Sequence, residues 1–232
     1  MKYFYSVASV AILASFASIA VISGCGKKPV VEPPKQKKIV FFGDSVTRGY
    51  GVQPGESFYD RISGVMKSGI YGDVVTINAG VSGNDTIEAI ARAATDVNAH
   101  EPDIVVIAFG LNDVQNTSLT PMKFRTNLEE LIDGMPEHTT ILLATSNTFL
   151  GSGEGIWTKL NDSLNLYMKE VVQVARARKI RLIDVHSAWI KQIKQDNRHM
   201  ESLYSDPTHP SATGHRLIYD IYMDSLRHIL VQ

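Results

Sequence analysis

Cysteine is almost absent from the sequence, which contains only Cys25. A chain with one thiol cannot form an internal disulfide bond, and an unpaired thiol in an exported chain needs its own explanation. The phosphate-binding motif G-x-x-x-x-G-K-[ST] is missing, and residues 49–55, GYGVQPG, do not match the dinucleotide motif G-x-G-x-x-G. No G-x-S-x-G sequence is present, which argues against an α/β-hydrolase. Histidines and carboxylates lack the spacing of metal ligands, so we expect neither a metal nor another cofactor.

The charges of the chain nearly cancel, because 23 lysines and arginines face 24 aspartates and glutamates and give a net charge of −1. Their distribution is uneven. Residues 26–38, GKKPVVEPPKQKK, carry +4, and the residues before them add only Lys2, which leaves −6 on the remainder. An acidic body gives no support for a nucleic-acid partner. A basic segment beneath that body would suit the anionic surface of a membrane.

The N-terminal segment contains a long apolar run without charge. Residues 7–22 form this run of 16 residues, which is shorter than the roughly 20 that a helix needs to cross a bilayer. Together with Lys2 the run is typical of an export signal, here residues 1–24, and a membrane anchor is the alternative. Residues 25–37 follow as a tether with three prolines, which favour an extended chain, and residues 38–232 are expected to form one domain.

Residues 22–25, ISGC, resemble the lipobox of bacterial lipoproteins, in which a small residue precedes the cysteine that receives lipid. This resemblance implies lipid attachment at Cys25 and a lipid-anchored protein of the bacterial cell envelope. A simple cleavage site with a stray thiol is the alternative. Gly26 rather than an aspartate follows the cysteine, which resembles outer-membrane sorting if the cell has two membranes.

Apolar runs alternate with helical patterns over the rest of the chain. Continuous apolar runs are typical of strands that are buried on both faces, and the runs predict strands at 38–42, 74–78, 103–109, 140–145 and 180–185. Helices are predicted at 59–66, 85–97, 121–135, 159–178 and 211–230. This alternation predicts a three-layer α/β/α sandwich with a mainly parallel sheet of about five strands.

Polar segments that contain glycine lie next to several of these elements. GDS (43–45) follows the first strand, AGVSGND (79–85) the second and GLND (110–113) the third, and DPTHPSATGH (206–215) precedes the last helix. Ligands of parallel sheets bind outside the carboxyl ends of the strands. We therefore expect the four segments to surround one rim of the domain.

The order of these segments resembles that of the SGNH hydrolases, a subgroup of the GDSL esterase and lipase family that is named for four motif residues. In this chain the four would be Ser45, Gly83, Asn112 and His209. Two departures are Val46, where the family name has leucine, and Pro207, where many members have glycine. The resemblance covers nearly the whole domain and implies the family's flavodoxin-like fold.

The chemistry of such a site explains these residue types. A serine hydroxyl is a weak nucleophile until a base takes its proton, and His209 would be that base, with Asp206 holding its imidazole. The resemblance implies an oxyanion hole formed by the backbone N–H groups of Ser45 and Gly83 and the side-chain amide of Asn112. It therefore implies a serine esterase that hydrolyses carboxylic esters.

Each of these residues has a simpler interpretation when it is taken alone. Ser45 could cap the following helix, Gly83 could start a turn, and residues 112–113 could cap or turn a loop. His209 has a competitor, because residues 196–199, DNRH, repeat the Asp-x-x-His spacing in a polar stretch. The combination of four segments favours the catalytic interpretation.

The sequence indicates the type of reaction more closely than it indicates the substrate. The family that the chain resembles hydrolyses short acyl esters, lysophospholipids, thioesters and acetylated glycans, and an envelope location favours lipid or glycan esters. We therefore expect a small-molecule, lipid or glycan ester as substrate. The alternatives are an O-acetylesterase of envelope polysaccharide or peptidoglycan and, in another class, a non-catalytic lipoprotein that binds glycan or lipid.

Residues 146–158, SNTFLGSGEGIWT, follow the fourth predicted strand and combine three glycines with four large apolar side chains. One hypothesis is a mobile flap that touches the substrate. The other is a surface loop that its aromatic residues pin to the domain.

The lipid anchor is tested by Cys25→Ser, which removes the thiol that lipid attachment requires. We expect the variant to leave the membrane fraction, because the hydroxyl does not accept the lipid. Cell fractionation with fatty-acid labelling measures this, and Ser23→Ala, which keeps a small residue near the cysteine, is the control. Unchanged membrane association of Cys25→Ser would contradict the anchor.

Overall fold

The computed structural model describes residues 36–151, 154–195 and 197–231. The proposed signal 1–24, Cys25 and most of the tether 25–37 lie outside this part of the chain, so these assignments stay predictions. Within the described residues, no helix is both long enough and apolar enough to cross a membrane.

A five-stranded sheet forms the centre of the fold, and every neighbouring pair of its strands runs parallel. The strand order is β2-β1-β3-β4-β5, which is the order of flavodoxin-like sheets. The strands are β1 (Lys37–Gly43), β2 (Val74–Gly80), β3 (Ile104–Ala108), β4 (Thr140–Ala144) and β5 (Arg181–Ile183). The prediction of a three-layer sandwich around a parallel sheet is confirmed.

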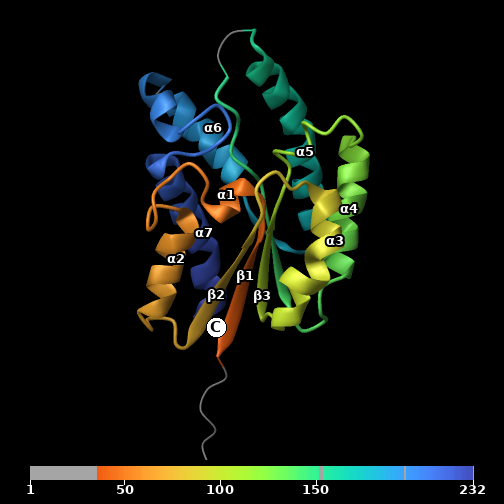
Figure 1. Ribbon diagram of the computed structural model, residues 1–232, viewed down its shortest axis with the longest axis vertical. Coiled ribbons are helices and arrows are strands. Elements are labelled where there is room, and N and C mark those ends of the chain that lie inside the picture. The colour runs from red at the N-terminus through yellow and green to blue at the C-terminus, as the bar shows by residue number, and fades with distance from the viewer. Residues whose placement is uncertain (1–35, 152–153, 196, 232) are drawn as a thin grey trace, which may run out of the picture. The chain divides into compact units, whose positions relative to one another are not determined.

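Helices cover both faces of this sheet (Figure 1). The helices on one face are α2 (Phe58–Lys67), α6 (Val185–Gln195) and α7 (Ala212–Leu230). Those on the other face are α3 (Thr86–Asp96), α4 (Pro121–Asp133) and α5 (Ile156–Arg178). The remaining helices are α1 (Ser45–Arg48), directly after β1, and two short 3₁₀ helices, Asn98–His100 and Asn197–Leu203.

Strand β1 shows why the central strands are apolar without interruption. Val40 and Phe42 lie in the core beneath α3, α4 and α5, whereas Ile39 and Phe41 lie in the core beneath α2, α6 and α7. All four side chains are at most 1% exposed. Because successive side chains of a strand point to opposite faces, a strand covered on both sides needs an apolar residue at every position.

Helix α6 is the longest element that the sequence pattern does not predict. The apolar run 180–185 predicts a strand as far as Val185, but β5 is only three residues long and α6 already begins at Val185. Val185 and Trp189 are buried one turn apart, and the indole N–H of Trp189 donates to the Tyr204 hydroxyl at 2.8 Å. Because many residues after Trp189 are polar, the apolar face of this helix is too short to predict a helix from the sequence.

A buried polar network ties the loop after β3 to α3 and α4. Asp113 Oδ1 accepts hydrogen bonds from the backbone N–H (3.0 Å) and the hydroxyl (2.6 Å) of Thr86. The Thr86 hydroxyl oxygen in turn accepts one from the side-chain amide of Asn127 at 2.9 Å. The second carboxyl oxygen of Asp113 is buried without a partner among the described residues. Burial raises the pKa of Asp113 to about 6, because it disfavours the ionised form.

This pKa shift predicts a pH dependence of stability. A carboxyl group whose pKa rises on folding, here from 3.8 to about 6, stabilises the fold at low pH and loses this contribution as the pH rises through that range. Asp113→Asn removes the titration and keeps an oxygen that accepts from Thr86. We therefore expect the free energy of unfolding of the wild type, measured in urea, to fall relative to that of the variant from about pH 4 to about pH 6. A difference that does not change over this range would contradict the prediction.

Candidate active site

Ser45 is held by a short helix at the carboxyl end of β1. The Asp44 carboxylate caps α1 by accepting a hydrogen bond from the Val46 N–H at 2.9 Å, and Gly49 ends the helix with a φ of 87°. Ser45 is the first residue of this helix and is 6% exposed. The simpler interpretation, in which Ser45 caps the helix, is therefore wrong, because Asp44 occupies that position.

Two glycines allow α1 to lie directly on the sheet. A Cβ atom at Gly43 would clash with the Thr47 hydroxyl, and a Cβ atom at Gly80, the last residue of β2, would clash with the backbone nitrogen of Arg48. The helix backbone thus approaches the end of β2 more closely than any side chain would permit, while at Gly43 the Thr47 side chain and the Ala108 carbonyl oxygen take the space.

The segment before α7 brings His209 to this serine. His209 Nε2 lies 2.9 Å from Ser45 Oγ, and His209 Nδ1 lies 2.7 Å from Asp206 Oδ2. The other carboxyl oxygen of Asp206 accepts the backbone N–H groups of Thr208 and His209, each at 2.8 Å. Burial alone would raise the pKa of Asp206, but these hydrogen bonds lower it below its usual value. The carboxylate therefore stays ionised beside the imidazole.

The segment after β4 fixes the position of this loop. The Leu150 N–H donates to the carbonyl oxygen of Pro207 at 2.7 Å. The Asn147 side-chain amide donates to the carbonyl oxygen of Thr208 at 3.1 Å. The first of these bonds joins backbone to backbone, so it restrains the loop whatever side chains surround it.

The ring of His209 is also covered by an aromatic side chain. Tyr50, which is 53% exposed, lies against it with the ring centres 4.4 Å apart. Sequence patterns do not single out Tyr50 or Asn147, because both contact the loop that carries His209, which is far from them in the chain.

The predicted oxyanion residues come from the loops after β2 and β3. Gly83 has a φ of 82°, in the left-handed region that favours glycine, and open space lies where its side chain would be. The side-chain amide of Asn112 donates to the backbone oxygen of Asn84 at 2.9 Å. This bond uses one of the two N–H groups of that amide and leaves the other for a further acceptor.

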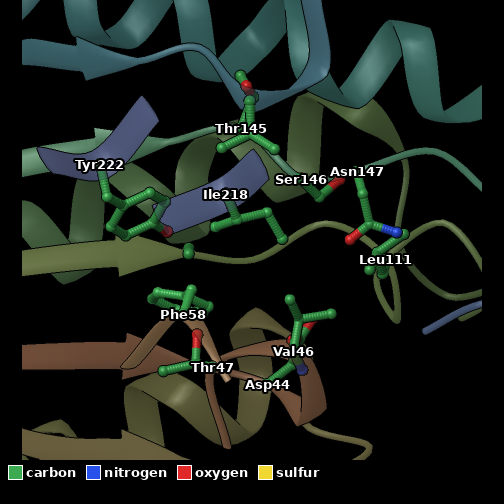
Figure 2. Close-up of a pocket in the computed structure, with 12 residues that line it drawn as sticks. Asp44, Val46, Thr47, Phe58, Leu111, Thr145, Ser146, Asn147, Ile218 and Tyr222 are labelled. Atoms are coloured by element: carbon green, nitrogen blue, oxygen red, sulfur yellow. The ribbon is translucent and has the colours of Figure 1, made fainter. Parts of the chain in front are cut away.

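A small cavity lies beside α1 and extends toward α7 (Figure 2). Its volume is about 20 Å³, which is room for about one water molecule and too little for a long acyl chain. Asp44 lines this cavity, and its pKa is raised to about 7, mainly by burial and further by the charge of Asp113. Burial also raises the pKa of Tyr222, another residue of the lining.

The loop 146–158 packs against the domain at the residues that the structure describes. Phe149 is 1% exposed, and its backbone N–H and carbonyl oxygen are both bound by the side chain of Asn161, at 2.8 Å and 2.9 Å. The rings of Phe149 and Trp157 lie 5.6 Å apart, and Trp157 packs against the core. These contacts favour the hypothesis of a pinned loop over that of a flap.

Two other sequence features concern alternative sites. Asp196 and the side chain of His199, which form the competing Asp-x-x-His pair, lie outside the described residues. Among the residues that the structure does describe, no three histidine, cysteine, aspartate or glutamate side chains come together as a metal site would require.

The sequence matches that of known esterases over most of its length. The sequence model of the GDSL-like lipase/acylhydrolase family matches residues 41–217. An acetylxylan esterase of Geobacillus stearothermophilus is 25% identical over 203 residues, which are 78% of this chain and 90% of that protein. A lipoprotein of Bacillus subtilis, YqeF, is 30% identical over 132 residues, which are 53% of this chain and 51% of that protein.

Solved structures share the fold. A lipase/acylhydrolase from Enterococcus faecalis superposes with a TM-score of 0.70 at 26% identity, over 83% of this chain and 96% of that one. The acetylxylan esterase Axe2 of Geobacillus stearothermophilus superposes with a TM-score of 0.69 at 23% identity, over 81% of this chain and 93% of that one. The sequence match and this fold agree, and the chain belongs to the GDSL-like lipase/acylhydrolase family, as a carboxylic ester hydrolase of the SGNH type.

Proposed function

We propose that this esterase works through a triad of Ser45, His209 and Asp206. The 2.9 Å distance between Ser45 Oγ and His209 Nε2 carries the proposal, because a general base must lie within hydrogen-bond reach of the proton that it takes. The contact of 2.7 Å between His209 Nδ1 and Asp206 favours the tautomer with a proton on Nδ1, which leaves Nε2 free to accept. The ionised Asp206 would also stabilise the imidazolium that forms.

The reaction would proceed as two successive acyl transfers. Ser45 Oγ attacks the ester carbonyl while its proton passes to His209 Nε2, and the ring then gives that proton to the leaving alkoxide. Water attacks the acyl-serine with the same ring as base, and the carboxylic acid leaves as Ser45 regains its proton. Each tetrahedral intermediate carries negative charge on the former carbonyl oxygen.

That charge would be stabilised by the backbone N–H groups of Ser45 and Gly83 and by the amide of Asn112. The left-handed backbone at Gly83 and the open space beside it support close approach of a substrate. The hydrogen bond from Asn112 to Asn84 supports a fixed direction for the remaining amide N–H. Donors that are fixed before the reaction stabilise the developing charge without a cost of reorganisation.

Acetyl esters of an envelope polysaccharide or of peptidoglycan are a narrower candidate for the substrate. The similarity to an acetylxylan esterase, which extends over 90% of that protein, favours a short acyl group on a glycan. Lipid esters and small-molecule esters remain the broader substrate class.

We also infer that Cys25 anchors the protein to a membrane of the cell envelope through a lipid. The ISGC sequence at residues 22–25 carries this inference. The similarity to the YqeF lipoprotein over 132 residues supports it.

The proposed nucleophile is tested by Ser45→Ala on a panel of p-nitrophenyl and glycan esters. We expect kcat to fall by a factor of at least about 10⁴ on every substrate that the wild type hydrolyses, because no other hydroxyl lies at His209 Nε2 among the described residues. Ser68→Ala, at the end of α2, is the matched control and should keep wild-type rates. Comparable rates for Ser45→Ala, or no turnover of any ester by the wild type, would contradict the proposal.

The oxyanion role of Asn112 is tested by Asn112→Ala and Asn112→Asp. We expect either change to lower kcat by about 10²–10³ with little change in KM, because the lost N–H acts on the transition state. Gln115→Ala, which removes an amide that donates to the Leu111 carbonyl oxygen, is the control. A rise in KM at constant kcat would instead assign Asn112 to substrate binding.

A further inference from the structure

Arg92 on α3 binds two of the segments that form the candidate site, one at the end of β1 and the other at residues 79–85. Its guanidinium donates from Nη2 to the carbonyl oxygen of Gly43 (2.8 Å), from Nη1 to that of Ala79 (2.9 Å) and from Nε to Asn84 Oδ1 (2.7 Å). Gly43 ends β1, Ala79 lies next to the end of β2, and Asn84 lies in the loop that follows β2. One side chain therefore connects the ends of β1 and β2, from which the segments that carry Ser45 and Gly83 emerge.

The guanidinium is held in place on its remaining sides. Its Nη1 donates to Asp96 at 3.0 Å, one turn further along α3, and its Cζ lies 4.5 Å from the centre of the Phe42 ring. Burial alone would raise the pKa of Asp96, but hydrogen bonds from Thr95 and Arg92 lower it, so this partner is ionised. Only 14% of the Arg92 side chain is exposed. A planar, buried and paired guanidinium has little freedom to rotate.

Each proposed oxyanion donor is linked to a residue that Arg92 binds. The link is either a short stretch of chain or one hydrogen bond. Ser45 lies two residues after Gly43, and Gly83 directly precedes Asn84. The backbone oxygen of Asn84 accepts the amide of Asn112 at 2.9 Å. The three donors come from α1, from the loop after β2 and from the loop after β3, and Arg92 joins the end of β1 directly to the Asn84 loop.

We propose that Arg92 is the positioning residue of the oxyanion hole. It fixes these three segments relative to one another, so that their N–H groups converge on one point. This inference rests on the proposed function, because it assumes the donor roles of Ser45, Gly83 and Asn112. A misplacement of about 1 Å at such a site can lower the rate by about 10²-fold, and it does so in the transition state rather than in substrate binding.

Arg92→Lys is the first test, because lysine keeps the charge but lacks the planar fork that reaches four acceptors. We expect kcat for p-nitrophenyl acetate to fall by about 10- to 100-fold, with KM within about twofold of the wild type. Arg125→Lys is the matched control, since Arg125 on α4 also pairs with an acid four residues later, Glu129, and should leave kcat unchanged.

A double-mutant cycle separates positioning from a general loss of structure. In the Asn112→Ala background one of the donors that Arg92 positions is already gone, so we expect Arg92→Lys to lower kcat by a clearly smaller factor there. A purely structural role would lower kcat by the same factor in both backgrounds. Thermal unfolding of each variant shows whether the fold is intact.

Asn84→Ala keeps the arginine and removes only one of its acceptors, so it tests the inference even if Arg92→Lys does not fold. We expect a smaller fall in kcat at constant KM. Wild-type kcat in both folded variants, or equal factors in the double-mutant cycle, would overturn the inference. If Ser45→Ala stays active the proposed function is wrong, whereas wild-type kcat in these variants with an inactive Ser45→Ala contradicts the role of Arg92 alone.

Discussion

Parallel pairing of all five strands is the constraint on which the site depends. It places the carboxyl ends of β1, β2 and β3 along one edge, so residues that are distant in sequence leave the sheet close together. Ser45 and His209 lie 164 positions apart and still come within 2.9 Å. Strand β1 is anchored in two cores at once, because its successive side chains enter the core on alternate faces of the sheet. The close packing of both cores therefore restrains the edge that carries Ser45.

Burial alone does not determine the charge of the carboxyl groups around the site. Asp206 is partly buried, but it accepts two backbone N–H groups and contacts the His209 ring, and its pKa is lowered. Asp44 is more deeply buried, and burial together with the nearby Asp113 raises its pKa to about 7. The acid beside the imidazole is thus kept ionised, while Asp44 and Asp113 resist ionisation.

The sequence alone predicts the sheet and the four polar segments, because both are recognised from residues that are neighbours in the chain. Continuous apolar runs mark the strands, and residues 43–45 follow the first of them directly. The contacts of Arg92 cannot be predicted from the sequence, because its acceptors lie up to 49 residues away. An arginine on a helix is also most often a surface residue. Helix α6 is missed for a related reason, because Trp189 is buried by residues distant in sequence, such as Tyr204.

The close seating of α1 on Gly43 and Gly80 has a consequence for engineering this enzyme. Since a side chain at either position would meet backbone atoms, repacking of the neighbouring side chains cannot make room for a larger residue. Libraries that aim at new ester preferences should hold these two glycines constant and vary the outward-facing rim instead, where Tyr50, Val81 and Ile87 are exposed.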